Sequence, residues 1–121
     1  MRALLPAMAA VLLAASPAED PVTALSGEWT VDLRVSLTDE PYSQPMVLTV
    51  GSDGSVTGSF YISEILAGKA GTAQDRTCVL FRTTDGSGFY HTSACLIGGK
   101  LAGQTWAEGR GFVLPWTAER K

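Results

Sequence analysis

The sequence predicts an all-β protein: an antiparallel, eight-stranded up-and-down β-barrel with one disulfide, preceded by a signal peptide. Apolar and polar residues alternate strictly from Trp29 to Leu37, which is typical of a half-buried strand. Short stretches that suit strands recur at roughly ten-residue spacing, joined by Gly-rich turns. The two cysteines occupy positions that a hairpin would place opposite each other. A chain of sequential hairpins hides its strand edges by closing into a barrel.

Residues 1–18 have the composition of a secretory signal. Arg2 supplies a positive start, an apolar run extends from Ala3 to Ala15, and Ser16-Pro17-Ala18 offers small residues for cleavage. The apolar run is shorter than the roughly 20 residues that span a bilayer. A retained N-terminal helix is the alternative. We therefore expect residues 19–121 to form a single domain, either secreted or periplasmic.

The charge balance excludes some partners. The chain carries 9 basic and 12 acidic residues and a net charge of −3. It contains no basic run and no cluster of aromatic and basic residues. Nucleic acid and anionic membrane surfaces are therefore poor partners. No cysteine lies near the expected cleavage site, so a lipid-type membrane anchor is not expected.

Each expected strand is an alternating or apolar stretch bounded by turn residues. The eight strands are expected at residues 28–37, 46–50, 56–62, 66–72, 77–83, 89–96, 100–106 and 112–117. Pro115 lies within the last of these. Because proline cannot donate a hydrogen bond to its neighbour strand, we expect a bulge or the end of regular pairing there.

Cys78 and Cys95 are the only cysteines. The residues from Thr84 to Gly88 predict a hairpin turn, and a hairpin centred between Gly86 and Ser87 places the two cysteines directly opposite. Opposed residues have Cα atoms about 4.5–5.5 Å apart, within the range of a disulfide. A metal or redox pair is the less favoured alternative, since the chain has no CxxC motif and a single histidine. We expect no metal and no cofactor.

Two short pieces of sequence resemble the calycin group, the lipocalin-like and avidin-like barrels. They are Gly27-x-Trp29, which opens the first expected strand, and Arg120, just after the last. The resemblance covers the mature chain only in its number of strands. It implies structural roles for Gly27, Trp29 and Arg120, with the tryptophan at the closed end of the barrel and the arginine packed over it.

The avidin comparison excludes biotin as the ligand. Streptavidin-type chains hold the ureido group of biotin with an Asn and a Ser on the first strand and with a Tyr on the third. The matching positions here are Val31, Val35 and Phe60. A buried ureido group without polar partners would lose about 1–3 kcal/mol for each missing hydrogen bond.

The inward positions of the strands define a candidate ligand site. Tyr90 and Thr92 would be its polar groups, and Tyr42, in the loop 38–45, would cover the opening as a lid. The expected lumen residues are Val31, Leu33, Val35, Phe60, Phe81, Tyr90 and Thr92. An eight-stranded barrel is just wide enough to be filled by side chains or to hold one small ligand. The sequence leaves open whether this one is hollow or solid.

No pattern in the sequence indicates catalysis. There is no Gly-x-Ser-x-Gly motif, and the single histidine, His91, is expected on the surface opposite Arg82. We therefore expect a non-enzymatic, exported protein that binds a small apolar molecule. One alternative is a protein-binding module, such as the small periplasmic barrels that inhibit metalloproteases, with residues 19–24 as the inhibitory plug. The other is a structural envelope protein with a solid core. Oligomeric state is not determined.

Overall fold

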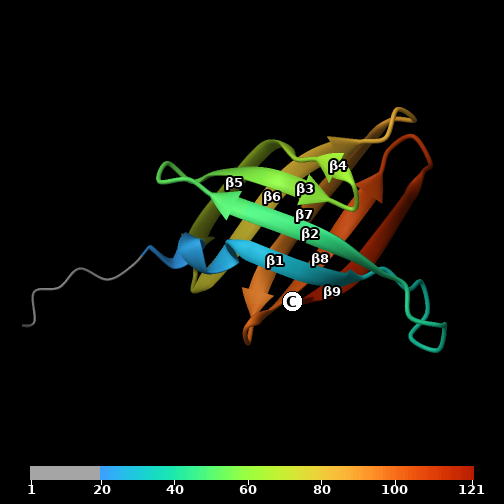
Figure 1. The fold of residues 1–121 in the computed structure, drawn as a ribbon, viewed down its shortest axis with the longest axis horizontal. Helices are drawn as coiled ribbons and strands as arrows, with labels where there is room; N and C mark the ends of the chain where they lie inside the picture. Colours follow the sequence, from blue (N-terminus) through green and yellow to red (C-terminus); the bar gives the residue numbers. More distant parts are fainter. Residues whose placement is uncertain (1–19) are drawn as a thin grey trace, which may run out of the picture.

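A computed structural model describes residues 20–121 as a closed, antiparallel β-barrel (Figure 1). The expected signal peptide, residues 1–18, lies outside the described residues. The strands neighbour one another in the order β2-β1-β9-β8-β7-β6-β5-β3, and pairing of β2 with β3 closes the barrel. Their bounds are β1 Gly27–Asp32, β2 Ser43–Val50, β3 Ser55–Phe60, β5 Leu66–Ala73, β6 Arg76–Thr84, β7 Phe89–Ile97, β8 Lys100–Ala107 and β9 Phe112–Arg120. The two-residue strand β4 (Ser63–Glu64) pairs with the end of β3. The predicted fold class is confirmed.

The β6–β7 hairpin has the expected register. Cys78 faces Cys95 across the two strands, and the residues that flank the turn, Thr84 and Phe89, also face each other. The cysteines form the predicted disulfide, with Cα atoms 4.0 Å apart. The register predicted from the turn residues is therefore the one observed in this hairpin.

β1 is shorter than predicted. It ends at Asp32, because the Asp32 carboxylate accepts hydrogen bonds from the backbone N–H and from the guanidinium of Arg34. These bonds, which lower the pKa of Asp32, turn the chain out of the barrel wall. Val35 is 86% exposed and Leu37 is 84% exposed, so their expected place inside a strand is wrong. The alternating pattern continues in the sequence, but the strand does not.

β3 and β9 also differ from expectation at their ends. β3 ends at Phe60, because the chain turns at Tyr61, whose φ is 65°. β9, by contrast, continues through Pro115 to Arg120. Pro115 faces Gln104 of β8, while β1 pairs only with the part of β9 from Thr117 onward. Pairing with β8 therefore does not break at Pro115, whereas pairing with β1 does not reach it, so the expected end of regular pairing is found on one side of β9 only. Proline is tolerated at such an edge.

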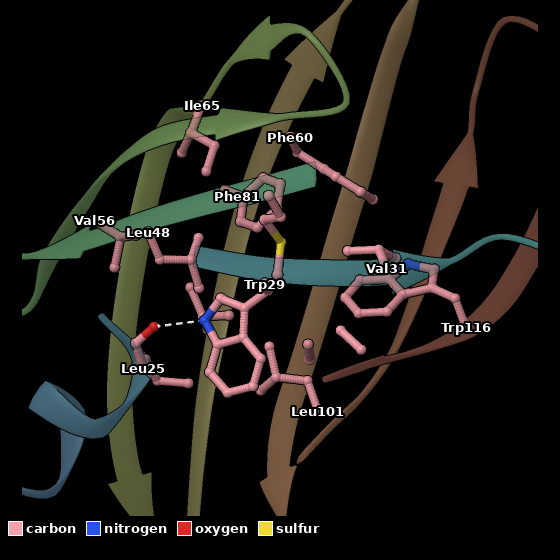
Figure 2. Packing of buried hydrophobic residues seen from close by; sticks show 14 residues of the cluster. Leu25, Trp29, Val31, Leu48, Val56, Phe60, Ile65, Phe81, Leu101 and Trp116 are labelled. Carbon is pink, nitrogen blue, oxygen red and sulfur yellow. Dashed lines mark hydrogen bonds between the residues drawn. The ribbon is translucent and has the colours of Figure 1, made fainter. Parts of the chain in front are cut away.

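One end of the barrel is closed by Trp29 and by η1, a short 3-10 helix (Pro21–Leu25). The Trp29 side chain is 1% exposed, and its Nε1 donates a hydrogen bond of 2.9 Å to the Leu25 carbonyl oxygen (Figure 2). The Arg120 guanidinium lies 4.3 Å from the centre of the Trp29 ring. It also donates hydrogen bonds to the carbonyl oxygens of Ala24 and Ser26. The Trp29–Arg120 contact that the calycin resemblance implied is present.

Gly27 is required beside this contact. Its φ is +133°, which L side chains rarely adopt, and an added Cβ would lie 3.0 Å from Nη1 of Arg120. Any other residue would strain the backbone and push the guanidinium away from the indole. The structural role expected for Gly27 therefore has a steric cause.

The interior above the closed end is packed solid. Trp29, Val31, Leu48 and Leu101 are almost fully buried there (Figure 2). Met46 is equally buried. Further along the barrel axis, the Phe60 ring contacts the rings of Phe81 and Trp116, at centroid distances of 5.8 and 5.6 Å. Gly103 leaves the space that Trp116 fills, since a Cβ at this position would lie 2.6 Å from the indole.

We predict that Arg120→Ala lowers the free energy of unfolding by about 1–2 kcal/mol, because it removes a cation–π contact and charge-assisted hydrogen bonds to two carbonyl groups. Urea unfolding followed by circular dichroism measures the change. Lys121→Ala removes an exposed cation from the next residue and should change stability by less than about 0.5 kcal/mol. Equal effects of the two substitutions would show that the arginine contact contributes nothing specific.

Candidate functional site: a cavity at the open end

The end of the barrel opposite η1 is hollow. Figure 1 shows η1 at one end and the β1–β2 loop at the other. A cavity of about 650 Å³ opens at the loop end. Its apolar lining consists of Leu33, Val35, Phe60, Ile62, Phe112, Val113 and Leu114. Its polar lining consists of Tyr42, Tyr61, Ser63, Thr83, Asp85, Tyr90, Thr105 and Arg110.

The exposure of the lining residues separates the floor of this cavity from its mouth. Phe60, Thr83 and Thr105 are buried and form the floor, whereas Val35 and Ile62 are each 86% exposed at the mouth. The rings of Phe81 and Trp116 pack beneath Phe60. The barrel is therefore solid in its closed half and hollow in its open half, which answers the question that the sequence left open.

A buried hydrogen-bond chain supports the floor. Nε1 of Trp116 donates to Oγ1 of Thr105 at 2.9 Å, and this hydroxyl is also 2.9 Å from Oγ1 of Thr92. Thr92 is thus satisfied within the packed interior. The sequence placed it in the lumen as a polar group for a ligand, but it does not line the cavity.

Asp85 organises the polar side of the cavity. Its carboxylate accepts hydrogen bonds from the hydroxyl and the backbone N–H of Ser87, at 2.6 and 3.0 Å, and from the Tyr90 hydroxyl at 2.8 Å. Arg110 adds an ion pair at 3.3 Å. The hydrogen bond from the Ser87 hydroxyl, followed by those from the Ser87 N–H and Tyr90, lowers the pKa of Asp85 to about 2. The charge of Asp85 is therefore already balanced within the protein.

The turns that carry Asp85 and Arg110 pack against each other. Glu108 N donates to the Phe89 carbonyl oxygen at 3.0 Å. A Cβ at Gly109 would lie 2.1 Å from the Ser87 carbonyl oxygen, so only glycine permits this approach. The β6–β7 and β8–β9 turns consequently form one continuous wall of the cavity.

Tyr42 lies on the opposite wall, in the loop between β1 and β2. Its hydroxyl forms a hydrogen bond with the hydroxyl of Tyr61, which raises the pKa of Tyr61. The two rings meet edge to face, with centroids 6.4 Å apart. All three tyrosines of the chain, Tyr42, Tyr61 and Tyr90, therefore line this one cavity. Tyr42 lies at the mouth, as expected, and its action as a lid stays a prediction.

The structure brings five of the predicted site residues together and separates three. Leu33, Val35, Phe60, Tyr90 and Tyr42 line the cavity. Val35 does so from a loop and not from the expected strand. Val31, Phe81 and Thr92 belong to the packed interior and do not line it.

Sequence reasoning missed Asp85 and Arg110, which it treated only as turn residues. A signal for them existed, because alternate turns of an up-and-down barrel lie at the same end. The expected turns around residues 38–45, 84–88 and 108–111 therefore share one end of the barrel, where their charged residues can meet.

His91 lies on the outer wall, away from the cavity. As predicted, it faces Arg82 across the strands. Its Nε2 lies 2.8 Å from Oε1 of Glu108, and its ring stacks on that of Trp106 at 4.9 Å. A shallower hollow of about 520 Å³ adjoins this stack.

Residues 20–121 contain no group of three or more His, Cys, Asp or Glu side chains that is placed to hold a metal ion. In the same part of the chain, no helix is long and apolar enough to cross a membrane. Comparisons of the chain with protein-family models, with curated proteins and with solved structures found no match.

We predict that Asp85→Asn destabilises the protein near neutral pH and that the difference from wild type shrinks in acid. The folded-state pKa of Asp85, about 2, lies below the ordinary aspartate value of about 3.9. The stability that this group contributes is therefore present above pH 4 and is lost as the pH falls toward 2.

Urea unfolding of both proteins between pH 2 and pH 7 tests this prediction. Asp75→Asn removes the same charge at the β5–β6 turn, at the other end of β6, and controls for the change in net charge. A difference between wild type and Asp85→Asn that stays constant from pH 6 to pH 2 would contradict the assignment.

Proposed function

We propose that this chain is an exported, non-enzymatic β-barrel protein that binds a small, largely apolar ligand in the cavity at the open end. The observation that carries the proposal is the cavity itself, whose volume of about 650 Å³ lies within the range of about 300–1,000 Å³ typical of ligand sites. Seven apolar side chains line it, together with eight polar residues, three of which are tyrosines that also contribute aromatic rings. That combination is characteristic of small-molecule pockets.

The proposal includes a calycin-like layout. Its support is the division of the barrel into an end closed by Trp29 and Arg120 and an opposite end that is open. An eight-stranded barrel is wide enough to hold one small ligand where side chains do not fill it.

Export to the periplasm or the surrounding medium is supported by two features of the chain. Residues 1–18 have the composition of a cleaved signal. The Cys78–Cys95 disulfide, which uses both cysteines, is of a kind that persists in oxidising compartments.

The two alternative functions receive less support. In an inhibitor, the segment before β1 would have to reach a protease, but Val22 in this segment is buried and the adjoining Leu25 is completely buried against the barrel. A structural protein with a solid core does not account for the hollow open half of the barrel. The pair of His91 and Glu108 is an outer-wall contact stacked on Trp106, and we assign it no catalytic role.

We predict that the wild-type protein binds N-phenyl-1-naphthylamine, an uncharged apolar fluorophore, and that two cavity variants lose this binding. Leu114→Trp fills the cavity without adding a charge, and Leu33→Lys places a cation in its apolar wall. Each should weaken binding by about tenfold or more, which corresponds to about 1.4 kcal/mol. Fluorescence titration measures the dissociation constants.

Leu80→Lys is the matched control. Leu80 is a large apolar residue exposed on the outer wall, so its replacement should leave the dissociation constant unchanged within about twofold. Circular dichroism confirms that each variant is folded. If wild type and both cavity variants take up the probe equally, the ligand site is not this cavity.

We also predict the mass of the native product. Protein recovered from the exported fraction should have the intact mass of residues 19–121 less two hydrogens, because the signal is cleaved and the disulfide is formed. Mass spectrometry under denaturing conditions, with and without reductant, measures both changes. A full-length mass in the cell interior would contradict export.

A further inference from the structure

Two exposed tyrosines join the β1–β2 loop to the turn that follows β3. The hydroxyls of Tyr42 and Tyr61 are hydrogen-bonded to each other, and the two rings meet edge to face with their centroids 6.4 Å apart. The two residues are 46% and 40% exposed. In each ring the ortho carbons lie two bonds from the hydroxyl oxygen, so the contact between the hydroxyls brings the ortho carbons of both rings into the same region. Two phenols in contact, both open to solvent, are placed for oxidative coupling to each other.

The backbone holds both members of this tyrosine pair. The carbonyl oxygen of Tyr42 accepts a hydrogen bond of 2.8 Å from the Leu33 N–H, and the N–H of Tyr61 donates one of 3.0 Å to the Pro45 carbonyl oxygen. Tyr61 has a φ of 65°, in the left-handed region that bulky residues rarely adopt. Because the chain already fixes both residues, little further ordering is needed to bring the two rings together.

Tyr90, the third tyrosine of the chain, is not part of this pair. Its hydroxyl donates to the Asp85 carboxylate at 2.8 Å, and the Arg110 guanidinium lies 6.0 Å from its ring centre. Within residues 20–121, the only two tyrosine rings that pack against each other are those of Tyr42 and Tyr61. The chain therefore contains its own control for a reaction that needs paired phenols.

We propose that Tyr42 and Tyr61 are a site of oxidative modification, at which a dityrosine bond ties the β1–β2 loop to the end of β3. Each phenol gives one electron and its hydroxyl proton to a peroxide-derived one-electron oxidant and becomes a phenoxyl radical. The two radicals join through a carbon–carbon bond between ortho positions, and the hydrogen on each of these carbons moves to the phenol oxygen. Overall the chain loses two hydrogens, and one hydrogen peroxide is reduced to two waters.

The bond would link residues that are 19 apart in the sequence. It would fix the loop that borders the cavity mouth, and it would restrict the unfolded chain by closing a loop. Neither effect depends on whether the cavity binds a ligand, so this inference stands apart from the proposed function.

The test treats dilute, disulfide-intact protein with a haem peroxidase and hydrogen peroxide. We expect a monomer that has lost two hydrogens and gained the fluorescence of dityrosine. Trypsin leaves both tyrosines in one peptide, residues 35–69, and Met46 is the only methionine within it. Met46 is 0% exposed, which protects its sulfur from the peroxide. Cyanogen bromide should therefore split this peptide from untreated protein, whereas the two fragments from treated protein should stay joined.

Three variants locate the bond. Tyr42→Phe and Tyr61→Phe each remove one phenol and keep the ring, and each should lose the mass change and the joined fragments. Tyr90→Phe removes the phenol outside the pair and should keep both. Treated wild type should also unfold at a higher urea concentration than untreated protein, and treated Tyr61→Phe should show no such shift.

Several results would overturn the assignment. Among them are the absence of dityrosine in the monomer, cross-links formed only between molecules, and joined fragments that persist in folded Tyr61→Phe. A dityrosine bond that forms without raising the urea midpoint would overturn the tying of the loop. Circular dichroism confirms that each variant is folded before treatment.

Discussion

The closed end of the barrel depends on the contact between Trp29, near the start of β1, and Arg120, the last residue of β9. The indole donates to the η1 segment through Leu25, and the guanidinium covers the indole while it binds the carbonyl groups of Ala24 and Ser26. One pair of side chains thus ties the segment before the first strand to the end of the last strand. β1 and β9 are neighbours in the barrel. This contact therefore covers the closed end and also joins the first strand to the last.

The hollow half follows from what happens at the other end of the same strands. β1 ends at Asp32 and β3 ends at Phe60. Beyond these ends, Val35 and Ile62 line the exposed mouth, while Leu33 lines the cavity and also packs against the core. The aromatic layer of Phe60, Phe81 and Trp116 forms the boundary between the two halves. The packed interior and the cavity therefore lie at different ends of one small barrel.

Polar groups near this boundary have two different fates. The Thr92, Thr105 and Trp116 groups satisfy one another and support the floor. Asp85, Tyr90 and Arg110 form a network in which the Asp85 carboxylate accepts from both other residues. Arg110 uses only Nη2 in this network. The first arrangement is buried, and the second lies at the exposed mouth of the cavity.

The sequence by itself determined the all-β class, the closed barrel and the register of the hairpin that carries the disulfide, because period-two patterning and turn residues act locally. It also identified Trp29 and Arg120, through a resemblance. Only the tertiary structure decided where β1 ends, since the alternation through Val35 and Leu37 continues after the Asp32–Arg34 hydrogen bonds have turned the chain away. The tertiary structure also decided which inward residues fill the core and which line the cavity. Val31 and Phe81 fill the core, whereas Leu33 and Tyr90 line the cavity. The difference is the height of each residue, that is, its position along the barrel axis between the closed and the open end. Height is set by strand stagger and by the lengths of neighbouring strands, and no local pattern encodes it.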